Sequence, residues 1–393
     1  MQPDVPMSRL NPSRRSRVAP FMAMDALRDA RALEREGRHI VHMELGEPGA
    51  PTPRRVREAA EAALRDGRFG YGEALGDAAL RARIAAHYGA RYRVDIPAER
   101  IIVTTGSSGG FMLALLAAFD PGARIAVTAP GYPAYTNILS SLGLEAVPLH
   151  LGQETRFAPT AAMLEKAHRV KKLDGALFMS PANPTGALIQ SEELSRICAF
   201  CDEAEVVFVS DEIYHGLEYA APAETALRFT QNAIVVNSFS KYYAMTGWRL
   251  GWLVAPDALM RPLERLQQSL AICAPTISQC AALAAFDATD ELEENRAAYA
   301  RNRALLLERL PGMGLGEFAP PDGAFYFYLD IADVTADSMD FCKRLLHEAG
   351  VAATPGLDFD PGRGATTIRL SYAGPEADVA EGVARLAAWL GRR

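Results

Sequence analysis

The middle of this 393-residue chain alternates short apolar segments with helix-like ones, and this alternation restricts the folds open to it. The apolar segments are rich in β-branched residues and are followed by turn residues, as buried strands are. The expected strands are Ile101–Thr104, Ile125–Thr128, Ala176–Met179, Val206–Val209, Ile234–Val236 and Leu250–Val254. The expected helices between and after them are Phe111–Phe119, Ala161–Lys171, Ser191–Glu205 and Ala255–Leu270. Such a pattern predicts an α/β fold with a mostly parallel sheet flanked by helices.

The C-terminal third follows a different pattern. One long helix is expected from Ile277 to Leu310, and beyond it strands and helices are mixed. The later elements are expected at Gly323–Leu329, Ser338–Glu348, Thr366–Ser371 and Glu376–Leu390. Because a chain of this length exceeds the usual size of one hydrophobic core, we expect a second, smaller α+β domain.

The charge balance and the cysteines exclude several kinds of partner. Lys and Arg number 41 against 48 Asp and Glu, so the basic excess usual in nucleic-acid-binding proteins is absent. No apolar run reaches the length of a membrane span. The chain has five cysteines, an odd number that favours a reducing compartment, and the CxxC at Cys198 and Cys201 has no second pair to complete a metal site. We therefore expect a cytoplasmic protein with no metal, nucleic-acid or membrane partner.

Ligands of open α/β sheets bind beyond the carboxyl ends of the strands, so the residues that follow each strand are the candidates for a site. The first expected strand is followed by Gly106-Ser107-Ser108-Gly109-Gly110 and then by a helix. Glycines let the backbone approach a ligand closely, and a helix start offers free N–H groups to a phosphate. A plain tight turn would have the same composition, so this segment alone does not distinguish a phosphate site from a turn.

The next three strands each present one or two polar or aromatic side chains. Tyr132 follows the second strand, Asn183 lies in the loop after the third, and Asp211 with Tyr214 follows the fourth. Tyr132 by itself could be a packed loop residue. A carboxylate just beyond a buried strand needs a partner, because an unpaired buried charge is costly.

The fifth strand is followed by Ser238, Ser240 and Lys241, and then by Arg249. Lys241 has aromatic neighbours in the sequence, and desolvation would lower its pKa and free its amine for a Schiff base. A solvated lysine is the alternative. A ligand with a phosphate, an aromatic ring, a ring nitrogen and an aldehyde would use all of the side chains named above. Pyridoxal 5′-phosphate (PLP) is such a ligand.

In the order of these motifs, the chain resembles the class I and II aminotransferases, which are fold-type I PLP enzymes similar to aspartate aminotransferase. The resemblance runs from Leu45-Gly46-Glu47-Pro48 to Ile368-Arg369-Leu370-Ser371. Its most specific parts are Asn183-Pro184-Thr185-Gly186, Asp211-Glu212-Ile213-Tyr214 and Ser238-Phe239-Ser240-Lys241 through Gly247-Trp248-Arg249.

The resemblance implies a role for each matching residue. Lys241 would hold PLP as a Schiff base and later shuttle a proton. Asp211 would pair with the pyridinium nitrogen, Tyr214 and Asn183 would hydrogen-bond the phenolic oxygen, and Tyr132 would stack on the ring. The phosphate would be held by Ser107, Ser108, Ser238, Ser240 and Arg249. Tyr71 resembles a tyrosine that crosses from one subunit to the phosphate of the other, which implies a homodimer with shared active sites.

Arg369 resembles the arginine that binds the α-carboxylate of the amino-acid or 2-oxo-acid substrate, assisted by Asn183 and the backbone of Gly46. Read without the family, Arg369 would be a surface arginine. The chain departs from one branch of aspartate aminotransferases, which has a lysine where Ser108 stands here. That lysine meets a distal carboxylate, so the resemblance gives the family and leaves the substrate open.

The resemblance also implies a large PLP-binding domain, residues 56–275, while residues 1–55 together with 276–393 form an N-terminal arm and a small domain. The expected activity is transfer of an amino group from an L-amino acid to a 2-oxo acid in two half-reactions. A PLP lyase on the same fold, for example a carbon–sulfur lyase, is the alternative. A regulator that only senses PLP is disfavoured by the retained Lys241, and a dinucleotide dehydrogenase because Gly106–Gly110 does not fit G-x-G-x-x-G.

Overall fold

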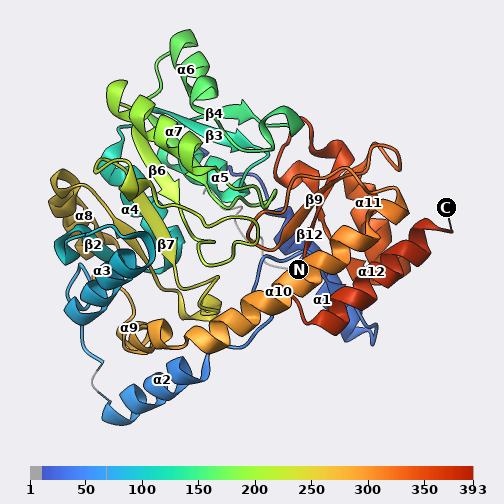
Figure 1. The fold of residues 1–393 in the computed structure, drawn as a ribbon, viewed down its shortest axis with the longest axis horizontal. Coiled ribbons are helices and arrows are strands. Elements are labelled where there is room, and N and C mark those ends of the chain that lie inside the picture. Colours follow the sequence, from blue (N-terminus) through green and yellow to red (C-terminus); the bar gives the residue numbers. More distant parts are fainter. Residues whose placement is uncertain (1–10, 68, 393) are drawn as a thin grey trace, which may run out of the picture.

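The computed structural model of the chain describes residues 11–67 and 69–392, so the first ten residues of the expected N-terminal arm lie outside it. A seven-stranded sheet forms the larger part of the molecule, with the strand order β2-β8-β7-β6-β5-β3-β4 (Figure 1). Its strands are β2 (Ile101–Thr104), β3 (Arg124–Ala129), β4 (Glu145–His150), β5 (Gly175–Met179), β6 (Val207–Asp211), β7 (Ile234–Ser238) and β8 (Gly251–Val254). Within this sheet β8 runs against the other strands, so the sheet is mostly parallel, as predicted.

Helices cover both faces of this sheet, which explains why its strands read as continuous apolar runs. Neighbouring strand residues point to opposite faces, so Ile101 and Val103 join one core cluster and Ile102 joins the other. One face packs against α4 (Gly106–Ala118), α5 (Pro133–Leu142) and α8 (Asp257–Leu270). The other packs against α3 (Ala78–Tyr92), α6 (Ala161–Val170) and α7 (Ser191–Glu203).

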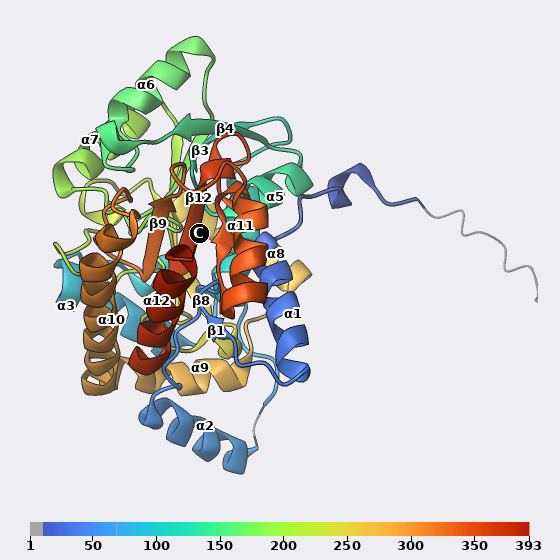
Figure 2. The ribbon, with the colours of Figure 1, turned by 90° about the vertical axis from the view of Figure 1, so that its right-hand side faces the viewer.

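The smaller part of the molecule joins the two ends of the chain. An antiparallel sheet has the order β11-β12-β9, and β1 pairs in parallel with β10. The strands are β1 (Val41–His42), β9 (Tyr326–Asp330), β10 (Val351–Ala352), β11 (Thr354–Pro355) and β12 (Thr367–Ser371). Around them lie α1 (Met22–Arg35), α11 (Ser338–Arg344) and α12 (Glu376–Leu390). Helix α10 (Thr289–Arg309) lies side by side with α12 (Figure 2).

Two of the predicted helices differ from the structure. The long helix expected from Ile277 to Leu310 is divided into α9 (Thr276–Leu283), a 3₁₀ turn and α10 (Thr289–Arg309). Asp290 and Glu291 occupy the first turn of α10, where acidic side chains favour a helix start. The helix expected from Phe111 begins at Gly106 instead, so the glycine-rich segment forms its first turn.

The strand expected from Gly323 begins three residues later, at Tyr326. In the large sheet the predicted strand boundaries are correct to within two residues, but the edge strand β4 was not predicted. Its side chains are mostly exposed or half-buried, and it contains Pro148, so it lacks the apolar run of the central strands. The remaining helix outside the two layers, α2 (Arg54–Asp66), packs against α9. None of the helices within residues 11–67 and 69–392 is long and apolar enough to cross a lipid bilayer.

Candidate active site

Lys241 lies directly after β7, at the carboxyl end of the sheet, as predicted. Its Nζ donates a hydrogen bond of 2.6 Å to the carbonyl oxygen of Gly46 and lies 6.0 Å from the centre of the Tyr214 ring. Burial lowers the pKa of the Lys241 amine to about 8, and the charges of Arg369 and Arg249 act in the same direction. The amine is therefore far closer to its neutral, nucleophilic form at pH 7 than an exposed lysine.

This lowered pKa has a measurable consequence for the protein freed of any cofactor. Acylation of Lys241 is expected to accelerate as the pH rises and to level off above about pH 8, because only the neutral amine reacts and its fraction grows until the pKa is passed. Mass spectrometry of the labelled protein at a series of pH values gives the rate, with the exposed Lys343 as reference in the same sample. A rise centred near the pKa of a free lysine, about 10.4, would contradict the expectation.

Asp211 is the last residue of β6 and is fully buried. Its Oδ1 accepts the backbone N–H of Ile213 at 3.0 Å, and its Oδ2 accepts a hydrogen bond from the hydroxyl of Tyr135. Burial raises the pKa of the Asp211 carboxyl to about 7, and these two hydrogen bonds oppose the rise. A carboxyl group in this setting gains a favourable partner when a protonated nitrogen is placed against it.

Tyr214 and Asn183 are also buried, and both lie where the sequence predicted them, beyond the ends of central strands. The hydroxyl oxygens of Tyr214 and Tyr326 are 2.6 Å apart. Asn183 Oδ1 accepts a hydrogen bond of 2.8 Å from Nη1 of Arg369. The structure therefore connects the loop after β5 and the turn after β6 with strands β9 and β12.

Arg369, in β12, is only 3% exposed. Besides Asn183, its guanidinium donates to the carbonyl of Glu44 and, at 3.4 Å, to Thr354 Oγ1, while Nε has no hydrogen-bond partner. The group is stacked between the rings of Tyr326 and Phe359, whose centres lie 4.5 and 4.7 Å from Cζ.

No ion pair between Arg369 and a carboxylate is found among the described residues. A buried cation without a counter-ion is costly, and the aromatic faces recover only part of that cost. The reading of Arg369 as a surface residue is therefore wrong, and its surroundings point to an anionic ligand.

The glycine-rich segment that was predicted to hold a phosphate forms the first turn of α4. Thr105, at the N-cap, makes no side-chain hydrogen bond to the helix. A Cβ atom added to Gly106 would lie 2.8 Å from Nη2 of Arg249, so the guanidinium stands directly against the first turn, next to Ser107 and Ser108. Free N–H groups at a helix start together with a guanidinium suit an anion.

Ser238 and Ser240 shape the turn that carries Lys241. Ser238 Oγ accepts the backbone N–H of Ser240 at 3.0 Å and lies 2.9 Å from both the Leu250 carbonyl oxygen and Ser240 Oγ. Both serines are buried, and their hydroxyls bond to each other and to the backbone. Their predicted contact with a phosphate stays a prediction.

Two further predicted residues lie at the edges of this group. Tyr132 precedes α5, is partly buried and packs edge-on against Tyr135, with ring centres 5.3 Å apart. Tyr71 is 85% exposed and lines a hollow of about 590 Å³ together with Thr105, which precedes the first turn of α4, and Thr276.

The structure adds Tyr135, Tyr326, Phe359 and Glu44, which the sequence did not single out. Tyr135 stands three residues after Tyr132, and Tyr326 ends the segment Gly323-Ala324-Phe325-Tyr326. Neither segment carries a charged residue, so no chemical signal marked these two tyrosines.

Comparisons with known proteins agree over nearly the whole chain. The family model described as aminotransferase class I and II matches residues 38–386. A valine–pyruvate aminotransferase from Mycobacterium tuberculosis is 48% identical over 380 residues, covering 96% of this chain and 97% of the relative. The crystal structure of an aminotransferase from the same species matches with a TM-score of 0.95 at 48% identity, covering 98% of this chain and 100% of that one. The structure of an aspartate aminotransferase from Thermus thermophilus with maleate has a TM-score of 0.91 at 31% identity, covering 96% and 99%.

Proposed function

From the premise that the chain belongs to the class I and II aminotransferases, we propose that it binds PLP through Lys241 and transfers the amino group of an apolar L-amino acid to a 2-oxo acid. That it is an aminotransferase follows from its relatives, which carry that activity in their names over nearly its full length. The alternative of a PLP lyase is not favoured.

One observation carries the choice of cofactor: the Lys241 amine, whose pKa is lowered, lies near the guanidinium groups of Arg249 and Arg369. Neither guanidinium has a carboxylate partner among residues 11–67 and 69–392. The donor set fits PLP. Arg249 and the start of α4 suit the phosphate, Asp211 suits the ring nitrogen, and the Tyr214 hydroxyl and the Asn183 amide suit the phenolic oxygen.

When bound, PLP supplies an electron-withdrawing ring that stabilises negative charge at the substrate Cα. The chain's own residues do the rest. Arg369 would bind the α-carboxylate through two parallel N–H donors and so fix the direction of the Cα–H bond. Lys241 Nζ would take the proton from Cα and return it elsewhere, a task for which a pKa near the working pH is suited. Asp211 would keep the ring nitrogen protonated.

We propose an apolar amino acid as the amino donor because each cation near Lys241 already has an assigned role. Arg369 and Arg249 are the cations whose charge lowers the pKa of Lys241, and both are assigned, one to the α-carboxylate and one to the phosphate. Ser108 stands where a branch of aspartate aminotransferases has a lysine for a distal carboxylate. The relative that is 48% identical is named for valine and pyruvate, which supports the same choice.

We propose a homodimer on the strength of an exposed apolar surface at the hollow near Tyr71. Phe69, Leu270 and Ile272 are 41%, 58% and 44% exposed, and such side chains gathered near one hollow suit a contact with another protein surface. A partner subunit would cover them, and Tyr71 would reach the phosphate of that partner. Sedimentation velocity would then give twice the 42.5 kDa of the chain.

The two domains proposed from the sequence, residues 56–275 and the two ends of the chain, are supported by the pairing of β1 with β10. The five cysteines are all free thiols, which supports a place in the cytoplasm.

The function is tested by adding single L-amino acids to the PLP-loaded protein without any oxo acid. Valine is expected to change the absorbance of the bound cofactor and to yield one 2-oxo acid per site, and added pyruvate should then restore the spectrum and yield alanine. Aspartate serves as the comparison and should react more slowly. Continued release of ammonia with an oxo acid would contradict transamination, and an unchanged spectrum after loading would contradict the cofactor site.

A further inference from the structure

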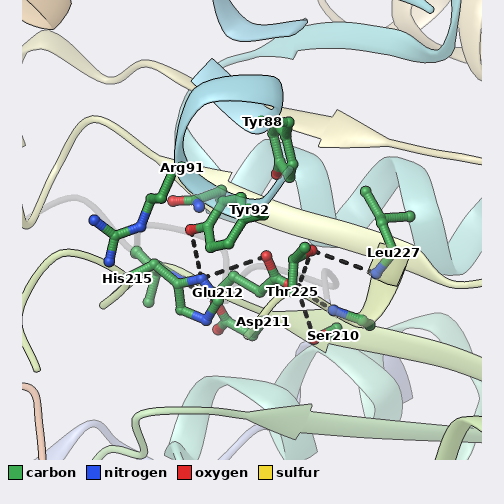
Figure 3. Close-up of polar contacts among 12 residues, drawn as sticks. Tyr88, Arg91, Tyr92, Ser210, Asp211, Glu212, His215, Thr225 and Leu227 are labelled. Atoms are coloured by element: carbon green, nitrogen blue, oxygen red, sulfur yellow. Dashed lines mark hydrogen bonds and ion pairs between the residues drawn. The ribbon is translucent and has the colours of Figure 1, made fainter. Parts of the chain in front are cut away.

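Two glutamates, Glu212 and Glu44, are buried within residues 11–67 and 69–392, and their carboxyl groups are hydrogen-bonded differently. Oε1 of Glu212 accepts three hydrogen bonds, which come from Ser210 Oγ, Thr225 Oγ1 and the backbone N–H of Ala226 (Figure 3). Oε1 of Glu44 lies 2.7 Å from Nδ1 of His42, and Oε2 of Glu44 has no hydrogen-bond partner among the described residues. Because an unpaired buried carboxylate is costly, the burial of Glu44 depends on His42.

The ring of His42 lies between two carboxylates. Its Nδ1 faces Glu44, and its Nε2 lies 3.1 Å from Oε1 of Glu34, in α1. A carboxylate can only accept a hydrogen bond, so both ring nitrogens donate and the ring is positively charged. The hydrogen bond to Glu44 is the main cause that raises the pKa of His42 to about 9. His42 and Glu44 therefore form an ion pair at neutral pH, in which the ring is partly exposed and the carboxylate is buried.

Glu44 is also bonded to Arg369, but through its backbone. Its carbonyl oxygen accepts a hydrogen bond from Nη2 of Arg369 and another, of 2.8 Å, from Oγ1 of Thr354. The buried carboxylate thus belongs to a residue that the buried guanidinium already contacts. Nevertheless, the two charges do not pair, and Oε2 of Glu44 and Nε of Arg369 both lack hydrogen-bond partners among the described residues. Opposite charges that are buried so near each other are expected to pair, so their separation needs a cause.

The ion pair with His42 is that cause. His42 and Glu44 are two residues apart at β1, so their side chains lie on the same side of the chain. A glutamate side chain has three rotatable bonds, and rotation about them would carry the carboxylate toward the guanidinium that is bonded to its own carbonyl. Such a rotation would break the hydrogen bond to the charged ring, which therefore opposes it.

We propose that His42 is a positioning residue that holds the carboxylate of Glu44 away from Arg369 and so leaves the guanidinium to the α-carboxylate of the substrate. This rests on the role proposed above for Arg369. With an internal carboxylate on the guanidinium, substrate binding would only exchange one carboxylate for another and would gain little from the contact.

The test removes the ring and measures how well the site binds a carboxylate. The ligand is 3-methylbutanoate, which is valine without its amino group and cannot be transaminated. In His42→Leu, the Kd of the PLP-loaded protein for 3-methylbutanoate is expected to rise about tenfold, because the freed carboxylate of Glu44 competes for the charge-assisted hydrogen bonds of Arg369. Isothermal titration calorimetry gives the Kd. The KM for valine should rise to a similar extent, while kcat changes less.

A double variant separates this competition from a structural role of His42. In His42→Leu with Glu44→Gln, no charge is left to compete for Arg369, so most of the affinity for 3-methylbutanoate should return. If His42 only stabilised β1, the second substitution would leave the loss in place or increase it, because it alters one more buried polar group.

His39→Leu is the matched control, because it makes the same substitution three residues earlier, in a histidine that faces Glu381 and is largely exposed. It is expected to leave the Kd unchanged. If His42→Leu does not fold, His42→Asn goes through the same measurements. Its amide still donates one hydrogen bond to Glu44 but carries no charge, so a smaller rise in Kd, about threefold, is expected.

A second readout uses the protein without cofactor. Nitrogen-15 NMR of the histidine rings at pH 7 should show His42 doubly protonated, with its signals identified by their absence in His42→Leu. A neutral ring would overturn the proposal, since no ion pair would then hold the carboxylate.

The proposal would also be overturned by a wild-type protein that does not bind 3-methylbutanoate, by an unchanged Kd in the variant of His42, or by a double variant without recovery. A protein whose Kd rises and recovers as expected, but which does not transaminate valine, would count against the proposed function alone.

Discussion

Replacing Lys241 by alanine is expected to lower kcat for transamination by at least about 10⁴-fold, because the substitution removes both the nucleophilic amine and the group that moves the Cα proton. Binding of PLP should be weakened but not lost, since Arg249 and the first turn of α4, which lie against each other, would still hold the phosphate in the proposed site. Steady-state kinetics with valine and pyruvate give the rate, and absorbance after dialysis gives the retained cofactor.

Lys343→Ala is the control for this substitution, because Lys343 is an exposed lysine of α11 outside the site, and its variant should behave as the wild type. Turnover by Lys241→Ala near the wild-type rate would mean that another residue moves the proton. A variant that is inactive and also holds no PLP at high concentration would show that the phosphate contacts are too weak, and would count against a phosphate site at the start of α4.

Replacing Asp211 by asparagine is expected to lower kcat by about 10²- to 10³-fold, the cost of removing one group that stabilises the charge of a reaction from a buried position. Asparagine has nearly the same shape, so the contacts with Ile213 and Tyr135 need not be lost and the effect isolates the charge. In the free chain the pKa of Asp211 is about 7, and a protonated nitrogen placed against the carboxylate would lower it, so the pairing should hold across neutral pH.

Tyr135→Phe provides the comparison for Asp211, because it keeps the carboxylate and removes a hydrogen bond to it. Its expected cost is about tenfold, since one hydrogen bond to a charged group is lost. The rates of the two variants and the absorbance of the bound cofactor are recorded from pH 6 to 9. Together they distinguish loss of the carboxylate charge from a change in the orientation of the carboxylate. Equal rates for Asp211→Asn and the wild type would show that the carboxylate does not act on the ring nitrogen.

The predicted strands matched the structure because the central strands are buried on both faces, and a doubly buried strand has to be apolar throughout. β4 lies at the edge of the sheet with Glu145 and His150 exposed, so its sequence lacks that run. The division between α9 and α10 depends on one turn near Ala284–Asp287, and no proline or glycine marks it.

The site could be predicted where a residue's chemistry is visible in the chain, as for Lys241 and Asp211 at strand ends. It could not be predicted where the role depends on contacts across the fold. The hydroxyl of Tyr326 meets that of Tyr214 across 112 residues of sequence, and Tyr326 also covers Arg369. Arg369 itself was assigned only through the family resemblance, because burial between two rings leaves no local pattern.

The hydrogen bonds of Arg369 join three distant stretches of the chain: Glu44 near the beginning, Asn183 in the middle and Arg369 near the end. Lys241, Asp211 and the start of α4 all precede the last of these. During synthesis on the ribosome, which proceeds from the N-terminus, the residues proposed to bind the cofactor are therefore complete more than a hundred residues before Arg369 is added. Under the roles proposed above, an unfinished polypeptide would lack the arginine that orients the substrate carboxylate.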